Sequence, residues 1–350
     1  MLPESLSRLL PGIGNTPILP VAVAYLGQSH DVLLKAEWHN PTGSIKDRTA
    51  AGLLWSIDRD EPLRPGTTIV ESTSGNLGMA LARLLPARGC RLLAVIDPKA
   101  PAATQTELVE AGAELRMATE PDGQGGYLLT RMRIVAALCR DNPGYRRSDQ
   151  YRNRANPLIH ELTTGPEIAA QGGDELDAVY VAVSTGGTLG GISAHISKAR
   201  PDVRIVAVDV ESSLALSTGQ SASRLIPGVG ASRPSSFLPA GSYDHAVRVS
   251  EAAALAICRI FLEDTGLRLG GSSGCTVRAY LSDLTAPRPP RHPVCVCPDS
   301  GGKYADTLYD DDWLMTVQMS AVVKESIDSF RAAGLAFQWK DEALAAGRLP

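Results

Sequence analysis

Short runs of apolar residues recur along the chain and alternate with segments that have the spacing of amphipathic helices. Residues 179–183 and 205–208 are apolar or aromatic at every position, which is typical of strands buried on both faces of a parallel sheet. This alternation of strands and helices predicts an α/β fold. The predicted strands are residues 32–38, 67–72, 91–97, 114–117, 178–183, 204–210, 246–249 and 293–297. The predicted helices are residues 46–59, 77–87, 102–111, 127–139, 157–171, 188–198, 251–265 and 275–284.

The length of 350 residues exceeds that of most single compact domains, so we expect two packed domains. A turn-rich segment, Asp-Asn-Pro-Gly-Tyr at residues 141–145, is the best candidate for a boundary between them. Beyond residue 320, Val323, Ile327 and Phe330 have helical spacing. The segment 321–350 is therefore predicted to be either a packed helix or an appended C-terminal tail.

The composition is that of an ordinary globular protein, with 44% apolar residues, 21% charged residues and a net charge of −4. There is no basic surplus for nucleic acid, and no stretch approaches the roughly 18 apolar residues of a membrane span. The N-terminus lacks the pattern of a signal peptide, and six cysteines are few for this length, so we expect a reduced, cytoplasmic protein. Cys295 and Cys297 could bind a metal, but their spacing better fits one face of a strand, so we expect no metal site.

A glycine-rich loop, Thr-Gly-Gly-Thr-Leu-Gly at residues 185–190, follows a predicted strand and begins a predicted helix. Glycines let backbone N–H groups approach an anion, and the helix N-terminus adds positive potential. The hydroxyls of Thr185 and Thr188 add donors, so this loop is a candidate phosphate site; a purely structural turn is the alternative. The loop has neither the ending of an ATP-binding loop nor the spacing of a dinucleotide-binding loop.

Three further segments combine small or polar groups with predicted helix starts. Residues 72–78, Ser-Thr-Ser-Gly-Asn-Leu-Gly, offer three hydroxyls and an amide, which suits a carboxylate better than the single group that a helix cap needs. Lys46 begins the first long helix, where the macrodipole disfavours its charge and lowers its pKa. A neutral amine is a nucleophile, although a solvated lysine beside Asp47 is the alternative. Residues 270–275 are predicted to form a turn of small residues before a helix.

These elements follow one order along the chain: Lys46, Ser-Gly-Asn, Thr-Gly-Gly-Thr, Gly-Gly-Ser-Ser-Gly and then Pro-Asp-Ser-Gly-Gly at residues 298–302. Together with Gly-Asn-Thr-Pro at residues 14–17, this order resembles the pyridoxal-phosphate (PLP) enzymes of the cysteine synthase and cystathionine β-synthase family over residues 12–314. The resemblance implies fold type II, similar to the tryptophan synthase β-subunit, with two domains that each contain a mainly parallel sheet flanked by helices. It also implies PLP as cofactor and a homodimer.

The resemblance implies a role for each motif residue. Lys46 resembles the lysine that binds PLP covalently and later moves the substrate α-proton, and Asn76 matches the asparagine beside the PLP 3′-oxygen. Ser272 matches the serine that faces the pyridine nitrogen, and an uncharged partner there favours β-elimination and replacement. The resemblance assigns the PLP phosphate to Ser184, Thr185, Gly186, Gly187 and Thr188. It assigns the substrate carboxylate to Thr73, Ser74, Gly75 and Gln150.

Departures from ordinary cysteine synthases indicate the substrates. Tyr151 and Ser184 each add a hydroxyl that the usual residue lacks, and extra donors suit a phosphate leaving group better than acetate. With segments 120–131, 227–234 and 309–314, these residues resemble the branch of N-(2-amino-2-carboxyethyl)-L-glutamate synthases. Such enzymes use O-phospho-L-serine and L-glutamate to make 2,3-diaminopropionate precursors of siderophores or peptide antibiotics. Arg131 could bind the phosphate or the glutamate carboxylates, or be a solvated helix residue.

The resemblance also divides the chain. It implies a larger PLP-binding domain of residues 1–34 and 151–320, and a smaller mobile domain, residues 35–150, that carries the substrate-carboxylate loop. The expected reaction is the β-replacement of O-phospho-L-serine with L-glutamate. Alternatives are a cysteine synthase that uses O-phosphoserine or O-acetylserine with sulfide, another β-substituted alanine synthase, or a catalytically inactive scaffold paralogue. The joint presence of all the cofactor motifs argues against the scaffold, which does not need them.

Overall fold

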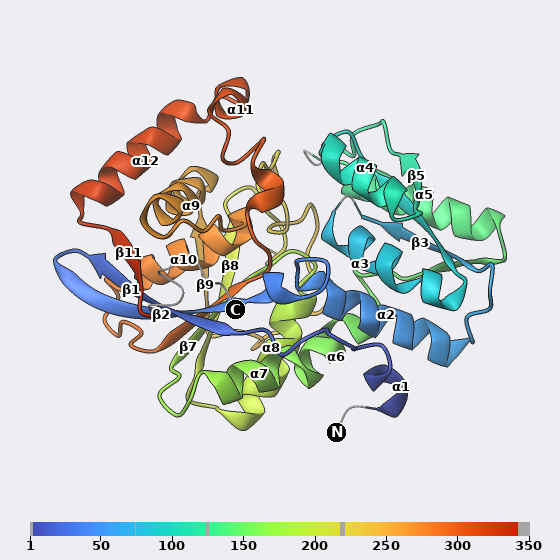
Figure 1. Cartoon of the computed structure of the whole chain (residues 1–350), viewed down its shortest axis with the longest axis horizontal. Coiled ribbons are helices and arrows are strands. Elements are labelled where there is room, and N and C mark those ends of the chain that lie inside the picture. Colours follow the sequence, from blue (N-terminus) through green and yellow to red (C-terminus); the bar gives the residue numbers. More distant parts are fainter. Residues whose placement is uncertain (1–2, 74, 124–125, 218–220, 342–350) are drawn as a thin grey trace.

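In the computed structural model, two sheets form the centres of two α/β units that lie side by side (Figure 1). The structure describes residues 3–73, 75–123, 126–217 and 221–341. Helix α1 (Glu4–Ser7) lies near the N-terminus and packs on α2 (Lys46–Asp60). Short 3₁₀ helices occur at Glu37–His39, Pro86–Arg88 and Gly302–Tyr304.

The larger sheet has the strand order β11-β1-β2-β10-β7-β8-β9 and is parallel from β2 to β9, with β1 and β11 antiparallel at one edge. Both of its faces are buried, because Tyr180 packs with α9 (Glu251–Thr265) and α10 (Gly271–Asp283) while Val179 packs with α8 (Gly187–Ala199). This burial explains the continuous apolar runs. Its strands are β1 (Ile18–Tyr25), β2 (Gln28–Ala36), β7 (Ala178–Ala182), β8 (Arg204–Val210), β9 (His245–Val249), β10 (Pro293–Cys297) and β11 (Ala336–Trp339).

The smaller sheet is parallel throughout and has the order β5-β4-β3-β6. Ile69 packs on one face with residues of α2 and α3, whereas Val70 packs on the other face with Val135 of α5. Its strands are β3 (Thr68–Ser72), β4 (Arg91–Ile96), β5 (Glu114–Met117) and β6 (Tyr145–Arg147). Its helices are α3 (Asn76–Leu84), α4 (Ala102–Glu110) and α5 (Leu128–Asp141).

Helices between the sheets connect the two units. Helix α6 (Ala155–Leu162) packs on both α2 and α8, and α7 (Thr164–Gln171) follows it directly. Because parallel strands end at the same edge of a sheet, the loops after β7 and β10 lie at one edge of the larger sheet. The loop after β3 of the smaller sheet meets them between the two units. These loops contain the motif segments at residues 72–78, 184–188 and 298–302.

All the predicted strands are confirmed, but β1, β6 and β11 were not predicted. The predicted helix at residues 157–171 is two helices, because the backbone at Thr163 leaves the helical region (φ −129°, ψ −67°). The turn predicted at residues 270–275 is wrong, because α10 begins at Gly271 and Ser272 lies in its first turn. Close packing of Gly271 and Gly274 against neighbouring segments explains why small residues form this turn of helix.

The described part of the segment after residue 320 packs on the larger unit. Helix α12 (Ser320–Ala332) follows α11 (Asp311–Thr316) and packs on α9, and β11 pairs with β1. Phe261 of α9 contacts the rings of Phe337 and Trp339, with centroid distances of 5.1 and 5.6 Å. Of the two alternatives for this segment, the structure therefore shows the packed helix. The small sheet lies within residues 35–150, and the proposed domain boundaries stay a prediction.

Replacing Trp339 with alanine should lower the free energy of unfolding by about 3–5 kcal/mol, because the ring is buried and packs edge-on against Phe261. Val322→Ala is the matched control, since Val322 is exposed on α12 and its loss should change stability by less than about 0.5 kcal/mol. Urea unfolding followed by circular dichroism measures both variants. Equal stability of the two variants would show that β11 is not part of the core.

Candidate active site

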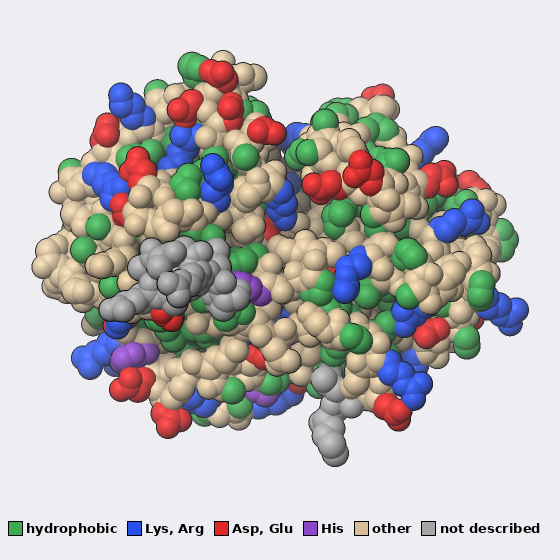
Figure 2. All heavy atoms as spheres, viewed as in Figure 1, with side chains coloured by type: hydrophobic (Ala, Val, Ile, Leu, Met, Phe, Trp, Pro, Cys, Tyr) green, Lys and Arg blue, Asp and Glu red, His purple; other side chains and the backbone are tan. Residues whose placement is uncertain are grey.

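A cavity of about 620 Å³ lies between the two units, where the loops that follow the parallel strands meet. Figure 2 shows the surface hollowed between the units. The predicted site residues that line the cavity are Lys46, Thr73, Gly75, Asn76, Arg131, Gln150, Tyr151, Ser184, Thr185, Gly186, Thr188 and Ser272. Gly187 lies behind this wall, where a Cβ would overlap Asn156. Ser74 lies outside the described residues.

Lys46 is the first residue of α2, and its side chain lines the cavity. Burial of the amine lowers its pKa to about 8, although the negative charge of Asp299 opposes this shift. The sequence predicts a lowered pKa from the helix dipole, and the structure identifies burial as the main cause. A pKa near 8 leaves a useful fraction of the amine neutral and nucleophilic near neutral pH. The alternative of a fully solvated lysine is therefore wrong.

Residues 184–188 form a cradle at the N-terminus of α8. Gly186 has a φ of +86°, in the left-handed region that favours glycine, and a Cβ there would overlap Ser235. The hydroxyl of Thr185 accepts a hydrogen bond from the N–H of Gly187 at 3.3 Å. Because the first N–H groups of a helix have no partners within the helix, this cradle can bind a phosphate.

Two residues of α6 that the sequence analysis did not identify support the cradle. The side-chain amide of Asn156 donates to the hydroxyl of Thr185 at 3.2 Å. His160 is buried, with Nδ1 2.9 Å from the Thr164 hydroxyl and Nε2 3.4 Å from the Thr188 hydroxyl. Burial lowers the pKa of His160 well below its ordinary value, so the ring is neutral. The only sequence signal was the position of His160 on the predicted helix 157–171, and Asn156 precedes that predicted helix by one residue.

The segment between β3 and α3 presents donors on another wall of the cavity. Thr73 Oγ1 accepts the N–H of Gly78 at 3.0 Å, which is a helix-capping contact, and its hydroxyl proton is left for a ligand. The side-chain amide of Gln150 donates to the backbone oxygen of Ser72 at 2.9 Å and holds the segment from the opposite side. The helix-cap role and the carboxylate-binding role predicted from the sequence are thus compatible for Thr73.

The three residues that the sequence connects with the leaving group share this cavity. Burial raises the pKa of Tyr151, and nearby arginines offset this shift only in part, so its hydroxyl stays protonated. Ser184 donates its hydroxyl to the backbone oxygen of Gly230 at 3.1 Å. Arg131 is only 12% exposed, and its Nε lies 3.3 Å from the Asp97 carboxylate. The interpretation of Arg131 as a solvated helix residue is therefore wrong.

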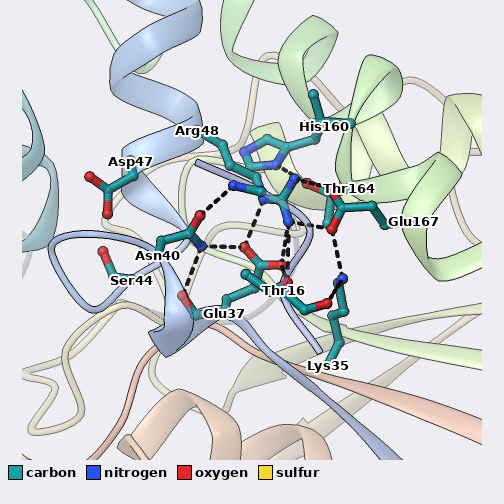
Figure 3. Close-up of polar contacts among 12 residues, drawn as sticks. Thr16, Lys35, Glu37, Asn40, Ser44, Asp47, Arg48, His160, Thr164 and Glu167 are labelled. Atoms are coloured by element: carbon teal, nitrogen blue, oxygen red, sulfur yellow. Dashed lines mark hydrogen bonds and ion pairs between the residues drawn. The ribbon is translucent and has the colours of Figure 1, made fainter. Parts of the chain in front are cut away.

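A buried ion network holds the beginning of α2 (Figure 3). Arg48, two residues after Lys46, pairs with Glu37 at 2.8 Å and with Glu167 of α7 at 2.7 Å. Lys35 also pairs with Glu167, at 2.7 Å. Burial opposes the charged form of Glu37, but the positive charge of Arg48 outweighs it, and the pKa of Glu37 is lowered. No local pattern in the sequence predicts this network, because Glu167, which joins Arg48 to Lys35, lies 119 residues from Arg48 in the chain.

Among the described residues, no group of three or more His, Cys, Asp or Glu side chains is placed to hold a metal ion. Cys295 and Cys297 are free, buried cysteines of β10, so the strand interpretation of this pair is confirmed. Among the helices that the structure describes, none has both the length and the apolar character needed to cross a membrane.

The family description "Pyridoxal-phosphate dependent enzyme" matches residues 9–299 of this chain. The chain therefore belongs to the family of PLP-dependent enzymes, and PLP is its cofactor. It is 38% identical over 308 residues to an N-(2-amino-2-carboxyethyl)-L-glutamate synthase of Ralstonia nicotianae, with 88% of this chain and 91% of that protein covered. A protein of the same name from Cupriavidus metallidurans is 35% identical over 315 residues, with 89% and 92% covered.

Solved structures share this architecture. An O-ureido-L-serine synthase matches with a TM-score of 0.77 and 30% identity, over 90% of this chain and 99% of that chain. A hydrogen sulfide-producing enzyme from Fusobacterium nucleatum matches with a TM-score of 0.82 over 97% and 98% of the two chains, and at 24% identity it supports the fold alone. The predicted fold type II architecture, PLP as cofactor and the assignment as a PLP-dependent transferase are confirmed.

The residues of the cavity fit PLP. Ligand sites of this kind occupy about 300–1,000 Å³, and this cavity combines the amine of a half-buried lysine, a phosphate-sized cradle with a positive-φ glycine, an amide and a buried hydroxyl. These groups belong to Lys46, residues 184–188, Asn76 and Ser272. Each lies in a different motif, which explains why the order of the motifs along the sequence indicates the cofactor.

Replacing Arg48 with methionine should lower the free energy of unfolding by about 3–5 kcal/mol, because the buried charge of Glu37 would lose its ion-pair partner and keep only the hydrogen bonds from Thr16 and Asn40. Arg59→Met is the matched control on the same helix, since Arg59 is 56% exposed and its ion pair contributes less than about 1 kcal/mol. Urea denaturation measures both. Adding Glu37→Gln to Arg48→Met should recover part of the loss; a further loss instead would contradict the role of the buried charge.

Proposed function

We propose that this protein catalyses the β-replacement of O-phospho-L-serine with L-glutamate, which yields N-(2-amino-2-carboxyethyl)-L-glutamate and phosphate. The observation that carries the proposal is that Lys46, Asn76 and the 184–188 cradle line one cavity together with the additional hydroxyl of Tyr151. Two relatives that are 38% and 35% identical to this chain are named N-(2-amino-2-carboxyethyl)-L-glutamate synthase. The product would be a 2,3-diaminopropionate precursor for siderophore or peptide antibiotic biosynthesis.

Lys46 would hold PLP and transfer the proton at the substrate α-carbon. Bound PLP supplies an electron sink that makes this proton removable. Because burial lowers the pKa of the Lys46 amine to about 8, the amine can both accept and return a proton near neutral pH. The cradle at residues 184–188 would bind the cofactor phosphate, and the Ser272 hydroxyl would face the ring nitrogen without adding a charge.

The donor substrate would bind between the two units. Thr73, Gly75 and Gln150 would hold its carboxylate. Thr73 and Gly75 offer hydroxyl and backbone donors on one wall of the cavity, and the Gln150 amide would exchange one of its contacts with Ser72 and Glu71 for the carboxylate. Tyr151 would donate its protonated hydroxyl to the leaving phosphate, with Arg131 near enough to stabilise the charge. Movement of a smaller domain, residues 35–150, would close the site and exclude water from the reaction. We also propose a cytoplasmic homodimer.

The acceptor would be a dianion, because cationic groups line the mouth of the same cavity. Lys99, Arg131 and Arg224 come from both units, and the guanidinium of Arg224 donates to the Ser232 hydroxyl at 2.8 Å. Glutamate carries two carboxylates, which such groups can hold while its α-amine attacks. Arg233, in a segment that the resemblance also connects with this branch, does not line the cavity. A sulfide acceptor would not need these cations, which distinguishes this proposal from a cysteine synthase.

Changing Tyr151 to Phe and Ser184 to Gly together should reduce the preference for O-phospho-L-serine over O-acetyl-L-serine. Each lost hydrogen bond to a charged phosphate costs about 1.5–3 kcal/mol, so the ratio of the two kcat/KM values should fall by about tenfold or more. Tyr243→Phe removes a tyrosine hydroxyl outside the cavity and is the matched control. An unchanged ratio in the double variant would contradict the phosphate role.

With O-phospho-L-serine as donor, L-glutamate should give a higher kcat/KM than sulfide, cysteine or ammonia, because only glutamate brings two carboxylates to the cationic groups of the cavity. Mass spectrometry identifies the adduct. Rapid formation of cysteine from sulfide, with no glutamate adduct, would establish the cysteine synthase alternative. Absence of turnover with every acceptor, in protein that has PLP bound, would support the scaffold paralogue.

Arg131→Met separates the two roles considered for this residue, with Arg133→Met, an exposed arginine of the same helix, as the control. If Arg131 serves the acceptor, the KM for glutamate rises by about tenfold and the KM for O-phosphoserine stays near that of the control. The opposite pattern would assign Arg131 to the leaving phosphate.

A further inference from the structure

Asp299 occupies a central position among the loops of the cavity. It follows β10 by two residues, belongs to the Pro-Asp-Ser-Gly-Gly motif, is 3% exposed and lines the cavity. In the sequence, this motif only supports the resemblance to the family, and it assigns no role to Asp299. The contacts of Asp299 give it one.

The backbone of the 298–299 segment holds two other motif loops. Ile45 donates its N–H to the backbone oxygen of Pro298 at 2.9 Å, and Ser44 forms a bridge with Asp299, so the segment just before Lys46 is fixed to β10. The backbone oxygen of Asp299 accepts the N–H of Gly270 at 3.2 Å, just before α10. Asp299 therefore lies between the segment that precedes Lys46 and the first turn of α10, which carries Ser272.

The side chain of Asp299 reaches across to the smaller unit. Its Oδ2 accepts hydrogen bonds from the amide nitrogen of Asn76 and from the hydroxyl of Tyr304, both at 2.8 Å, and pairs with Lys303 at 2.8 Å. Lys303 in turn donates to the amide oxygen of Asn76. Asn76 is thus held by an acceptor on its nitrogen side and by a donor on its oxygen side.

This pair of contacts determines the orientation of the Asn76 amide. In the flipped orientation, the amide oxygen would face the Asp299 carboxylate and the amide nitrogen would face the Lys303 ammonium, and both contacts would be repulsive. In the observed orientation, one of the two amide protons goes to Asp299 and the other is left for an acceptor in the cavity. A carboxylate is therefore needed at position 299 to present a donor, rather than an oxygen, to that acceptor.

The fold also reserves the space for this carboxylate. A Cβ on residue 270 would overlap Asp299 Oδ1, so Gly270 leaves room that any other residue would fill. Asp299 Oδ1 is buried and has no hydrogen-bond partner among the described residues, so within this part of the chain the side-chain hydrogen bonds of Asp299 go to Oδ2. The charge of Asp299 also raises the pKa of Lys46 against the effect of burial, so the carboxylate acts on both polar groups of the cofactor site.

We propose that Asp299, together with Lys303, is a positioning residue that fixes the Asn76 amide with its N–H toward the 3′-oxygen of PLP. This proposal rests on the proposed function, because it requires PLP in this cavity. An oxygen that carries negative charge is stabilised by an amide N–H and repelled by an amide oxygen, so the orientation of Asn76 contributes to the affinity for PLP and to its absorbance.

The test measures the dissociation constant of PLP and the ratio of the visible to near-ultraviolet absorbance bands of bound PLP, by titrating the apo form of the full chain. Asp299→Ala should raise the dissociation constant by about tenfold or more and change the band ratio. Asp31→Asn is the matched control, because it also removes a carboxylate ion-paired with a lysine, at 2.7 Å, but outside the cavity. The control should bind PLP within about twofold of the wild type.

A double-mutant cycle with Asn76→Ala shows whether Asp299 acts through Asn76. The proposal expects Asp299→Ala to weaken PLP binding by a much smaller factor in the Asn76→Ala background than in the wild type, since coupled residues are not additive. The remaining factor is the effect of the Asp299 charge on Lys46. The proposal would be overturned if the two increases in the dissociation constant of PLP multiplied in the double variant. It would also be overturned if Asp299→Ala left the ratio of the absorbance bands unchanged. Should Asp299→Ala fail to fold, Lys303→Met gives the same cycle at a partly exposed position.

Two outcomes separate this inference from the proposed function. A wild-type protein that binds PLP elsewhere than the cavity would overturn both. A wild-type protein that binds PLP in the cavity and is weakened by Asn76→Ala, but in which Asp299→Ala behaves like Asp31→Asn, would overturn the positioning role alone.

Discussion

The charge of Arg48 is buried in the interior only because the carboxylates of Glu37 and Glu167 surround it (Figure 3). These partners come from the end of β2 and from α7, so the network fixes the start of α2 relative to the large sheet. Lys46 is half a helical turn away and inherits this rigidity. Lys46 therefore lies at the start of a helix that packs on the smaller sheet, and the ion network connects this start to the larger unit.

Burial has two consequences at this site. It lowers the pKa of Lys46 to about 8 and makes the amine available as a nucleophile and base. The same desolvation makes every unpaired charge costly, which explains why the nearest carboxylate, Asp299, accepts hydrogen bonds from Asn76 and Tyr304 as well as pairing with Lys303. The polar groups of the cavity are therefore held by one another before any ligand binds.

The fold class and the cavity-lining motifs could be predicted from the sequence, because strands buried on both faces have continuous apolar runs and the motif loops follow strand ends. β1 was missed because Pro20 interrupts its apolar run and argues against a strand interior, and β6 because it has three polar or aromatic residues. The first turn of α10 was missed because Gly-Ser-Ser-Gly at residues 271–274 has low helix propensity and forms a helix through tertiary packing. The Arg48 network and the supports Asn156 and His160 depend on contacts between distant segments, which no local pattern shows.

The central claim is that Lys46 is the residue that binds PLP. Reduction of the PLP-loaded protein with borohydride, followed by digestion and mass spectrometry of the peptides, tests it directly, because reduction makes the linkage permanent. The account predicts the added mass on the peptide that contains Lys46. Lys99 and Lys303 line the same cavity, and a modified peptide that contains either of them, with Lys46 unmodified, would contradict the account.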